Sequence, residues 1–267
     1  MPQTVELYET AYSHFAEEAL AEVRRETYGE DFGQSSWVTA DEYWRFFRLL
    51  RLEPSDEVLD VGSGSGGPAI FLAREIGCRV MGVDVDPAGL RTALGLVESA
   101  GLGGKVDFQW ADAAERLPFE DGSFDAIVCM DAICHMADRG RLFAEWRRVL
   151  RPGGRVLFTD PVVLVGPVSK EELAERSSTG PFEYCAAGVN ERLLAAAGFE
   201  WLASEDATVN EADVSGRWRD AREARRDELS RIEGEETFAG LQRFLAVVHR
   251  LTSERRLLRV AYLAQRP

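Results

Sequence analysis

The chain has 267 residues, 45% of them hydrophobic, which is enough to bury the core of one large domain and a small appended one. Its formal net charge of −15 argues against nucleic acid or an anionic membrane surface as a partner, since both repel acidic proteins. No stretch reaches the roughly 20 apolar residues of a membrane helix, and the N-terminus lacks the layout of a signal peptide, so we expect a cytoplasmic protein.

The N-terminal part is rich in aromatic residues and has a helical pattern. Thr39-x-x-Glu42 is a possible capping box, and the helix that it opens would place Tyr43, Phe46 and Phe47 on one face. We expect this part to form a helical cap.

Between Glu57 and Asp160, short apolar runs alternate with helical patterns. This alternation predicts βαβ units and a parallel, doubly wound sheet. Asp86 and Pro87 are expected to begin the helix that follows the second strand. The five predicted strands are Val58–Val61, Arg79–Val85, Val106–Trp110, Phe124–Met130 and Arg155–Asp160.

The rest of the chain continues this pattern with one interruption. Asn190 can cap a helix, and Trp201–Ala203 and Leu258–Gln265 are predicted to be the sixth and seventh strands. Residues 207–256 between these strands are charged and helical, which is typical of a solvated helical insertion. An alternative interpretation is a homodimer surface formed by five apolar residues at helical spacing: Phe238, Leu241, Phe244, Leu245 and Val248.

These patterns divide the chain into three parts. Residues 1–50 are expected to be an N-terminal lid or cap, residues 51–165 a ligand-binding core, and residues 166–267 the remainder of the core with the insertion at 207–256. The four cysteines form no C-x-x-C pair, which favours reduced, buried thiols over disulfides or a metal site.

A glycine-rich loop follows the first predicted strand, in the stretch VLDVGSGSGGPAIFLA (58–73). Gly62, Gly64 and Gly67 satisfy the G-x-G-x-x-G dinucleotide pattern, and Asp84 stands where that pattern places a ribose-binding acid. However, Asp60 precedes the glycines, and a carboxylate there would repel a pyrophosphate and suit an ammonium group. A nicotinamide-dependent oxidoreductase is therefore a weaker interpretation.

Further motifs follow the loop in a fixed order. They are Asp84 at the end of the second strand, Ala111-Asp112-Ala113, Leu117-Pro118-Phe119, Phe124-Asp125, Arg151-Pro152-Gly153-Gly154 and Phe158-Thr159-Asp160. Together with the loop, they resemble the class I S-adenosylmethionine-dependent methyltransferases over about residues 28–165. The resemblance implies a Rossmann-like α/β fold, with a seven-stranded, mostly parallel sheet whose last strand is antiparallel. It also implies S-adenosylmethionine as the cofactor.

The resemblance implies cofactor-binding roles for nine residues: Asp60, Gly62, Ser63, Gly64, Asp84, Val85, Asp112, Ala113 and Met130. Asp60 would act through the ammonium group of the cofactor, Asp84 would accept both ribose hydroxyls, and Asp112 would accept from the adenine amino group.

The segment 28–37 corresponds to one that folds over the cofactor in related N-methyltransferases. Tyr28, Gln34 and Trp37 are therefore candidates for the lid. Aromatic faces there could shield a sulfonium or a methylated amine by cation–π attraction, worth about 0.5–2 kcal/mol each.

The candidate catalytic residues follow the fourth strand, in the stretch CMDAICHM (129–136). Asp131 and His135 are four residues apart, so a helical turn would place both on one face at the carboxyl end of the sheet. The stretch resembles that of phosphoethanolamine and sarcosine/dimethylglycine N-methyltransferases. We interpret His135 as a general base or a substrate-orienting residue, with a packing and hydrogen-bonding histidine as the alternative.

These observations predict a methyltransferase that acts on a small-molecule acceptor, in the first place an amine nitrogen. Methylation of oxygen or carbon in a specialised metabolite is an alternative. A non-catalytic protein that binds S-adenosylmethionine as a regulatory ligand is the alternative from a different class. Tyr8 and Tyr12 are loose candidates for the catalytic tyrosine of the phosphoethanolamine enzymes.

Overall fold

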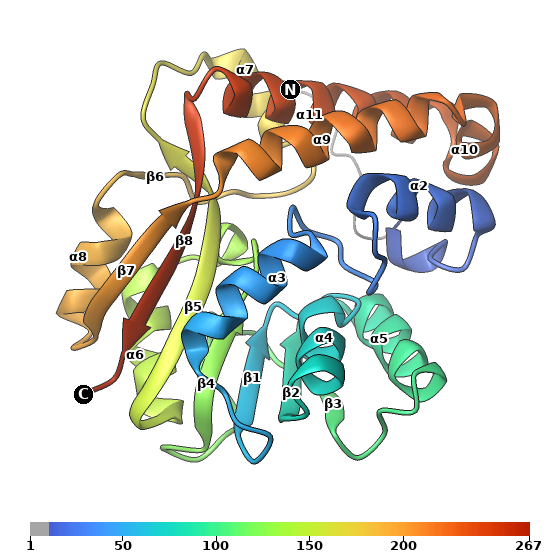
Figure 1. The fold of residues 1–267 in the computed structure, drawn as a ribbon. Coiled ribbons are helices and arrows are strands. Elements are labelled where there is room, and N and C mark those ends of the chain that lie inside the picture. Colours follow the sequence, from blue (N-terminus) through green and yellow to red (C-terminus); the bar gives the residue numbers. More distant parts are fainter. Residues whose placement is uncertain (1–10) are drawn as a thin grey trace.

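A mixed β-sheet forms the centre of the computed structural model, which describes residues 11–267 (Figure 1). Seven strands follow the order β3-β2-β1-β4-β5-β8-β7, and only β8 is antiparallel to its neighbours. Their bounds are β1 Glu57–Val61, β2 Arg79–Asp84, β3 Val106–Trp110, β4 Phe124–Cys129, β5 Leu150–Leu164, β7 Glu200–Asp206 and β8 Leu257–Gln265. The predicted fold, with its antiparallel last strand, is confirmed.

An eighth strand, β6 (Cys185–Ala186), was not predicted. It pairs in parallel with the end of β5, at Val163 and Leu164. The prediction ended the fifth strand at Asp160, whereas β5 continues to Leu164 and provides the edge to which β6 binds. Two residues are too few to give a recognisable strand pattern in sequence.

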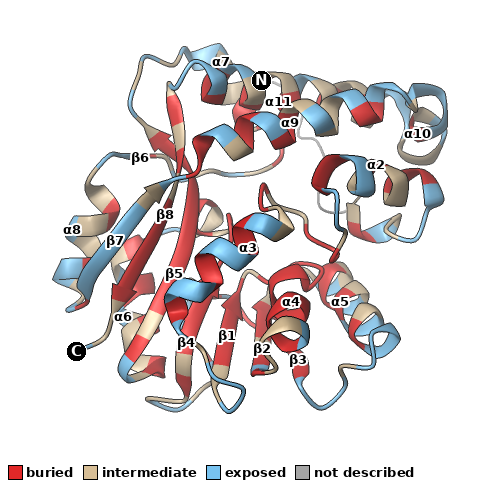
Figure 2. Cartoon of the chain, viewed as in Figure 1, coloured by how far each residue is buried: buried red, intermediate tan, exposed pale blue. Residues whose placement is uncertain are grey.

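Helices cover both faces of the sheet, because each buried strand directs alternate side chains to opposite faces. Val58 of β1 belongs to the hydrophobic core under α3, α4 and α5, and its neighbour Leu59 belongs to the core under α6 and α8. The bounds of these helices are α3 Ala40–Phe47, α4 Gly67–Glu75, α5 Pro87–Ser99, α6 Arg139–Val149 and α8 Val189–Ala196. Figure 2 shows the central strands buried over most of their length and β7 exposed at the edge.

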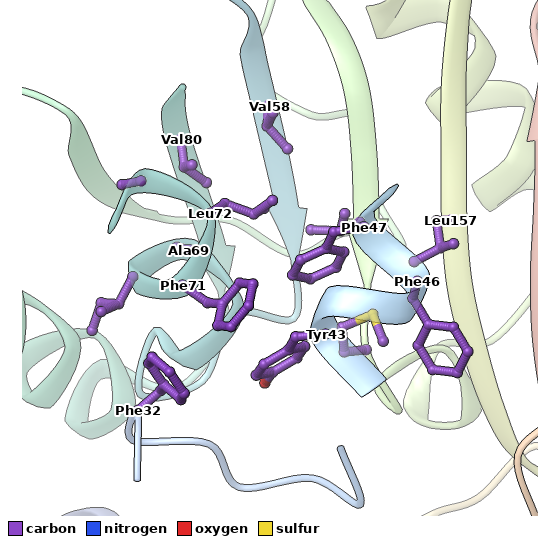
Figure 3. Close-up of a cluster of buried hydrophobic side chains, with 14 of the residues drawn as sticks. Phe32, Tyr43, Phe46, Phe47, Val58, Ala69, Phe71, Leu72, Val80 and Leu157 are labelled. Carbon is purple, nitrogen blue, oxygen red and sulfur yellow. The ribbon is translucent and has the colours of Figure 1, made fainter. Parts of the chain in front are cut away.

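An aromatic cluster joins α3 to α4 (Figure 3). The ring centroid of Phe71 lies 5.1 Å from those of Phe32 and Tyr43, and Tyr43 stacks on Phe47 at 5.2 Å. Phe46 is fully buried on the same helix. These contacts fix the segment before α3 against the helix that follows the glycine-rich loop.

A helical cap lies over the carboxyl ends of the parallel strands, at the top of Figure 1. It consists of α2 Glu18–Tyr28, α7 Lys170–Arg176, α9 Thr208–Glu223, α10 Arg226–Glu233 and α11 Glu235–Ser253. The five apolar residues considered as a dimer surface, from Phe238 to Val248, are at most 2% exposed. The dimer interpretation of these residues is therefore wrong, since they form the interior of the cap against α2 and α9.

Two predicted helix caps are also wrong. The Thr39 side chain makes no capping hydrogen bond, and the Glu42 side chain, which would complete the capping box, pairs with Arg259 instead. Gly188 precedes the helix that Asn190 was expected to cap, and the Asn190 side chain instead donates to Asp160. In both cases a buried charged partner distant in sequence determines where the polar side chain points.

All four cysteines are buried and unpaired. Within residues 11–267, no helix is both long enough and apolar enough to cross a bilayer.

Candidate active site

The glycine-rich loop joins β1 to α4 and is held by the end of β2. The backbone N–H groups of Gly62 and Ser63 donate to the Val83 carbonyl, at 2.9 and 3.1 Å. Gly62 and Gly64 both have positive φ, and a Cβ added to them would lie 2.4 Å from Ala132 Cβ and 2.5 Å from the Tyr12 hydroxyl oxygen, respectively. Glycine is therefore required by backbone conformation and by close neighbours alike.

Asp84 fixes the loop from the end of β2. One carboxylate oxygen accepts the Gly64 N–H at 2.7 Å, and the other accepts the Asp86 N–H at 2.9 Å. Burial raises the pKa of Asp84, and these backbone hydrogen bonds oppose the rise. Each oxygen keeps a second lone pair, so the carboxylate can still accept from a ligand hydroxyl.

Asp60 is fully buried at the end of β1, behind the loop. Neither of its carboxylate oxygens forms a hydrogen bond with the part of the chain that the structure describes. Burial raises the pKa of Asp60 to about 8, and the nearby Asp84 carboxylate raises it further, although the Ala69 backbone acts in the opposite direction. Burying a carboxyl group without a hydrogen-bond partner costs free energy of folding. A hydrogen-bond donor from a ligand at this position would offset that cost.

A cavity of about 400 Å³ opens in front of the loop, at the carboxyl ends of the strands. One end is lined by the loop, Asp84, Val85 and the stretch Ala111–Ala114. The other end, called the far end below, is lined by Asp131, His135 and the segment Thr179–Pro181. Such crevices at the carboxyl edge are the usual ligand sites of open α/β sheets.

His135 belongs to a short 3-10 turn, Ile133–His135, after β4. Its Nδ1 lies 3.0 Å from the Pro181 carbonyl oxygen, so Nδ1 carries the proton in the tautomer that this contact stabilises. Burial lowers the pKa of His135 to about 4; the Pro181 carbonyl opposes this and the Arg176 charge adds to it. The imidazole is therefore neutral at neutral pH.

Asp131 is the centre of a buried polar network rather than a free carboxylate. One oxygen accepts from the Thr159 hydroxyl at 2.6 Å and from Arg259 Nε at 2.7 Å, and the other accepts the Trp37 N–H at 2.9 Å. Arg259 also donates to Glu42 at 2.7 Å. The network joins β8, α3 and the turn after β4, and it positions the residues after β4 that line the far end of the cavity.

Residues 59–158 match the family model of a methyltransferase domain. The segment is a methyltransferase domain. The predictions of a class I S-adenosylmethionine-dependent methyltransferase and of its cofactor are thereby confirmed.

Relatives of this methyltransferase domain act on different atoms. The chain is 32% identical to 27-O-demethylrifamycin SV methyltransferase of Amycolatopsis mediterranei, over 60% of this chain and 61% of that one. It is 29% identical to the glycine/sarcosine/dimethylglycine N-methyltransferase of Actinopolyspora halophila, over 78% of this chain and 36% of that one. The chain thus spans less than two thirds of the length of these curated relatives.

A solved structure shares the fold of the chain. Phosphoethanolamine N-methyltransferase 2 of Haemonchus contortus, in complex with phosphomonomethylethanolamine and S-adenosylhomocysteine, superposes with a TM-score of 0.81. The match covers 100% of this chain and 61% of that one at 23% identity, which is evidence for the fold alone.

The residues of the methyltransferase domain fit S-adenosylmethionine. The Asp60 carboxyl group, buried behind the loop without a hydrogen bond, would suit an ammonium, and the loop's glycines would let a ligand approach its backbone closely. Asp112 accepts the Ala114 N–H at 2.9 Å through one oxygen, and its side chain lines the cavity where an adenine amino group is expected.

The cavity brings together most of the residues predicted from sequence. Those that line it are Gly62, Ser63, Gly64, Asp84, Val85, Asp112, Ala113, Met130, Gln34, Asp131 and His135. Asp60 lies behind this lining. Two lid candidates are placed elsewhere: the Tyr28 hydroxyl donates to the Ser36 carbonyl, and the Trp37 ring packs on Phe244 inside the cap. They support the segment that carries Gln34.

Several lining residues were missed by sequence reasoning. They are Ser35, Ser36, Tyr43 and Met136. The region 161–188, and Gly180–Tyr184 in particular, was expected from sequence to line the acceptor pocket, and it contributes Thr179, Gly180 and Pro181. Tyr12 was a loose candidate, and it lines the cavity beside Gly64; Tyr8 lies outside the described residues. Within residues 11–267, no group of three His, Cys, Asp or Glu side chains is arranged to hold a metal ion.

Proposed function

We propose that the chain transfers a methyl group from S-adenosylmethionine to the nitrogen of a small-molecule amine. When bound, S-adenosylmethionine supplies a methyl group already activated by its sulfonium. The protein then has to hold the acceptor in line and exclude water. The observation that carries the proposal is a single cavity that connects the glycine loop with a neutral histidine at its far end.

The low pKa of His135 favours nitrogen as the methylated atom. With a pKa of about 4, this imidazole is too weak a base to remove the proton of an alcohol, whose pKa is far higher. A neutral amine brings its own lone pair and needs only to be oriented. We therefore assign His135 the role of orienting the acceptor, and Asp131 the role of positioning the turn that carries His135.

The proposed cofactor contacts follow from the same cavity. Asp60 would hold the ammonium group, Asp84 the ribose hydroxyls and Asp112 the adenine amino group, with Met130 beside the reacting centre. Four unpaired cysteines support a reducing compartment such as the cytoplasm.

Oxygen methylation remains the second candidate, because a relative that is 32% identical carries the name of an O-methyltransferase. Isothermal titration with S-adenosylhomocysteine and with NAD tests the cofactor. Turnover is then measured as S-adenosylhomocysteine release with glycine, sarcosine, dimethylglycine, phosphoethanolamine and a panel of phenols. We expect turnover with amines; turnover with phenols alone would favour the second candidate, and binding without any turnover would favour a regulatory protein.

A further inference from the structure

Two buried charged side chains of the cap lack hydrogen-bond partners. Arg176, the last residue of α7, is 1% exposed, and Glu211, in the first turn of α9, is fully buried. Arg176 Nη2 and Glu211 Oε1 are 3.8 Å apart, which is too far for a hydrogen bond. In the described part of the chain, none of the three guanidinium nitrogens and neither carboxylate oxygen forms one.

The pair lies directly behind the far end of the cavity. The guanidinium carbon of Arg176 is 4.4 Å from the ring centroid of Phe182, and that centroid is 4.4 Å from the ring of His135. Thr179 lines the cavity, and its hydroxyl also has no hydrogen bond among the described residues. Arg176 and Glu211 do not themselves line the cavity, and the Phe182 ring contacts both the Arg176 guanidinium and His135, so a ligand at the far end would have to pass this ring to reach the pair.

The stability of the fold does not explain this pair. Buried ion pairs contribute little to stability compared with apolar residues of the same volume, and this one forgoes most of its hydrogen bonds. Burial raises the pKa of Glu211 to about 8, the Arg176 charge opposes the rise, and the Asp131 carboxylate adds to it. Glu211 can therefore donate a proton to a partner or accept one near neutral pH.

We propose that Arg176 and Glu211 recognise the acceptor by binding a neutral polar group that it carries, such as a hydroxyl or a carboxamide. Such a group accepts from the guanidinium and donates to the carboxyl group, so it satisfies both partners at once. The inference rests on the proposed function and narrows its acceptor to an amine with a second, uncharged polar end. Arg176 and Glu211 are then specificity-determining residues, remote from the methylated atom.

The test compares ω-amino alcohols of two to five carbons with alkylamines of the same length. Binding is measured by thermal shift of the protein saturated with S-adenosylhomocysteine, and methyl transfer by S-adenosylhomocysteine release. We expect the wild type to prefer one amino alcohol over its alkylamine by about tenfold or more. Arg176→Met and Glu211→Gln should each reduce that preference severalfold while the affinity for S-adenosylhomocysteine stays unchanged.

The double variant Arg176→Met/Glu211→Leu separates recognition from structure. We expect it to melt at or above the wild-type temperature and to lose the preference altogether. The control is Arg243→Met, which removes a partly exposed ion pair between α11 and Glu175 of α7 and should leave the preference intact.

Three results would overturn the inference: a wild type without a preference in either assay, a preference that survives the double variant, or a double variant that melts far below the wild type. Failure of the proposed function has another signature. In that case the preference in binding depends on the pair, but no methyl group is transferred to any member of the series.

Discussion

Asp60 shows how one residue can link ligand binding to the pH dependence of folding. Its pKa is about 8 in the folded protein and about 3.9 in an unfolded chain, so between these values the folded state binds more protons. Stability without ligand should therefore fall as the pH rises from about 4 to 8. An ammonium group at this site favours the charged carboxylate, so the affinity for S-adenosylhomocysteine should rise over the same range.

Asp60→Asn should remove both pH dependences. We expect the affinity for S-adenosylhomocysteine to fall about tenfold to a hundredfold, as for the loss of one charge-assisted hydrogen bond. The melting temperature at pH 8 should stay the same or rise, because an unpaired buried charge is removed. Titration calorimetry and melting curves at pH 5 and 8 measure these effects; an unchanged affinity at pH 8 would contradict the assigned contact.

His135 offers a second prediction at this scale. If it orients the acceptor, His135→Gln should keep at least about a tenth of the wild-type kcat, because a glutamine side chain can still form hydrogen bonds. His135→Ala should lose more. A general base typically raises the rate about 10²- to 10⁴-fold. A loss of kcat of that size in both variants would mean that His135 is a general base. Between pH 5 and 7, His135 is already neutral and does not titrate. The pH profiles of kcat/KM for the wild type and His135→Gln should therefore have the same shape in this range.

At the scale of elements, Arg259 joins three parts of the fold that are far apart in sequence. It is fully buried on β8, and it pairs with Glu42 of α3 and with Asp131 after β4. Arg259→Met would leave the buried Asp131 carboxylate without its cation and Glu42 with Arg45 alone, so the free energy of unfolding should fall by about 3–5 kcal/mol. Urea denaturation measures this loss.

The control for that variant is Arg141→Met, which removes an exposed pair with Glu115. An exposed pair is worth about 0–1 kcal/mol, so this variant should remain close to the wild type. Equal losses of unfolding free energy in the two variants would mean that the buried Arg259 network stabilises the fold no more than an exposed ion pair does.

The same network shows which elements could be predicted from sequence and which could not. The loop, Asp84 and Asp112 were predictable because each follows a short apolar strand and has a fixed place in the order of motifs. Glu42 was assigned to a capping box because local spacing was the only available signal, whereas its partner Arg259 lies on the last strand. The region 161–188 was expected at the acceptor pocket, but it has no periodic pattern, so only the fold shows that Thr179–Pro181 is the part that lines the cavity.

At the scale of the whole molecule, three of the segments that line the cavity come from distant parts of the chain. Gly33–Ser36 precedes α3, the glycine loop follows β1, and Thr179–Pro181 follows α7. The first and last of these regions adjoin cap helices, whose apolar cores are separate from those under the sheet. A ligand that contacts all three regions therefore couples the cap to the core, because it binds only when both are folded.

Hydrogen exchange should reveal this coupling. With S-adenosylhomocysteine at 100 times its Kd, folding is stabilised by about 2.7 kcal/mol, which corresponds to roughly a hundredfold slower exchange for amides that open only when the site is lost. We expect this slowing in Gly33–Ser36 and in the glycine loop, and a smaller effect in Thr179–Pro181, which lines the far end. Helix α10 contributes nothing to the cavity lining, so those of its amides that exchange by local fraying should exchange at the same rate with and without ligand and serve as the internal control. Protection confined to the glycine loop and Asp84–Ala114 would instead mean that the cap closes without contacting the cofactor, and the lid role of Gln34 would be lost.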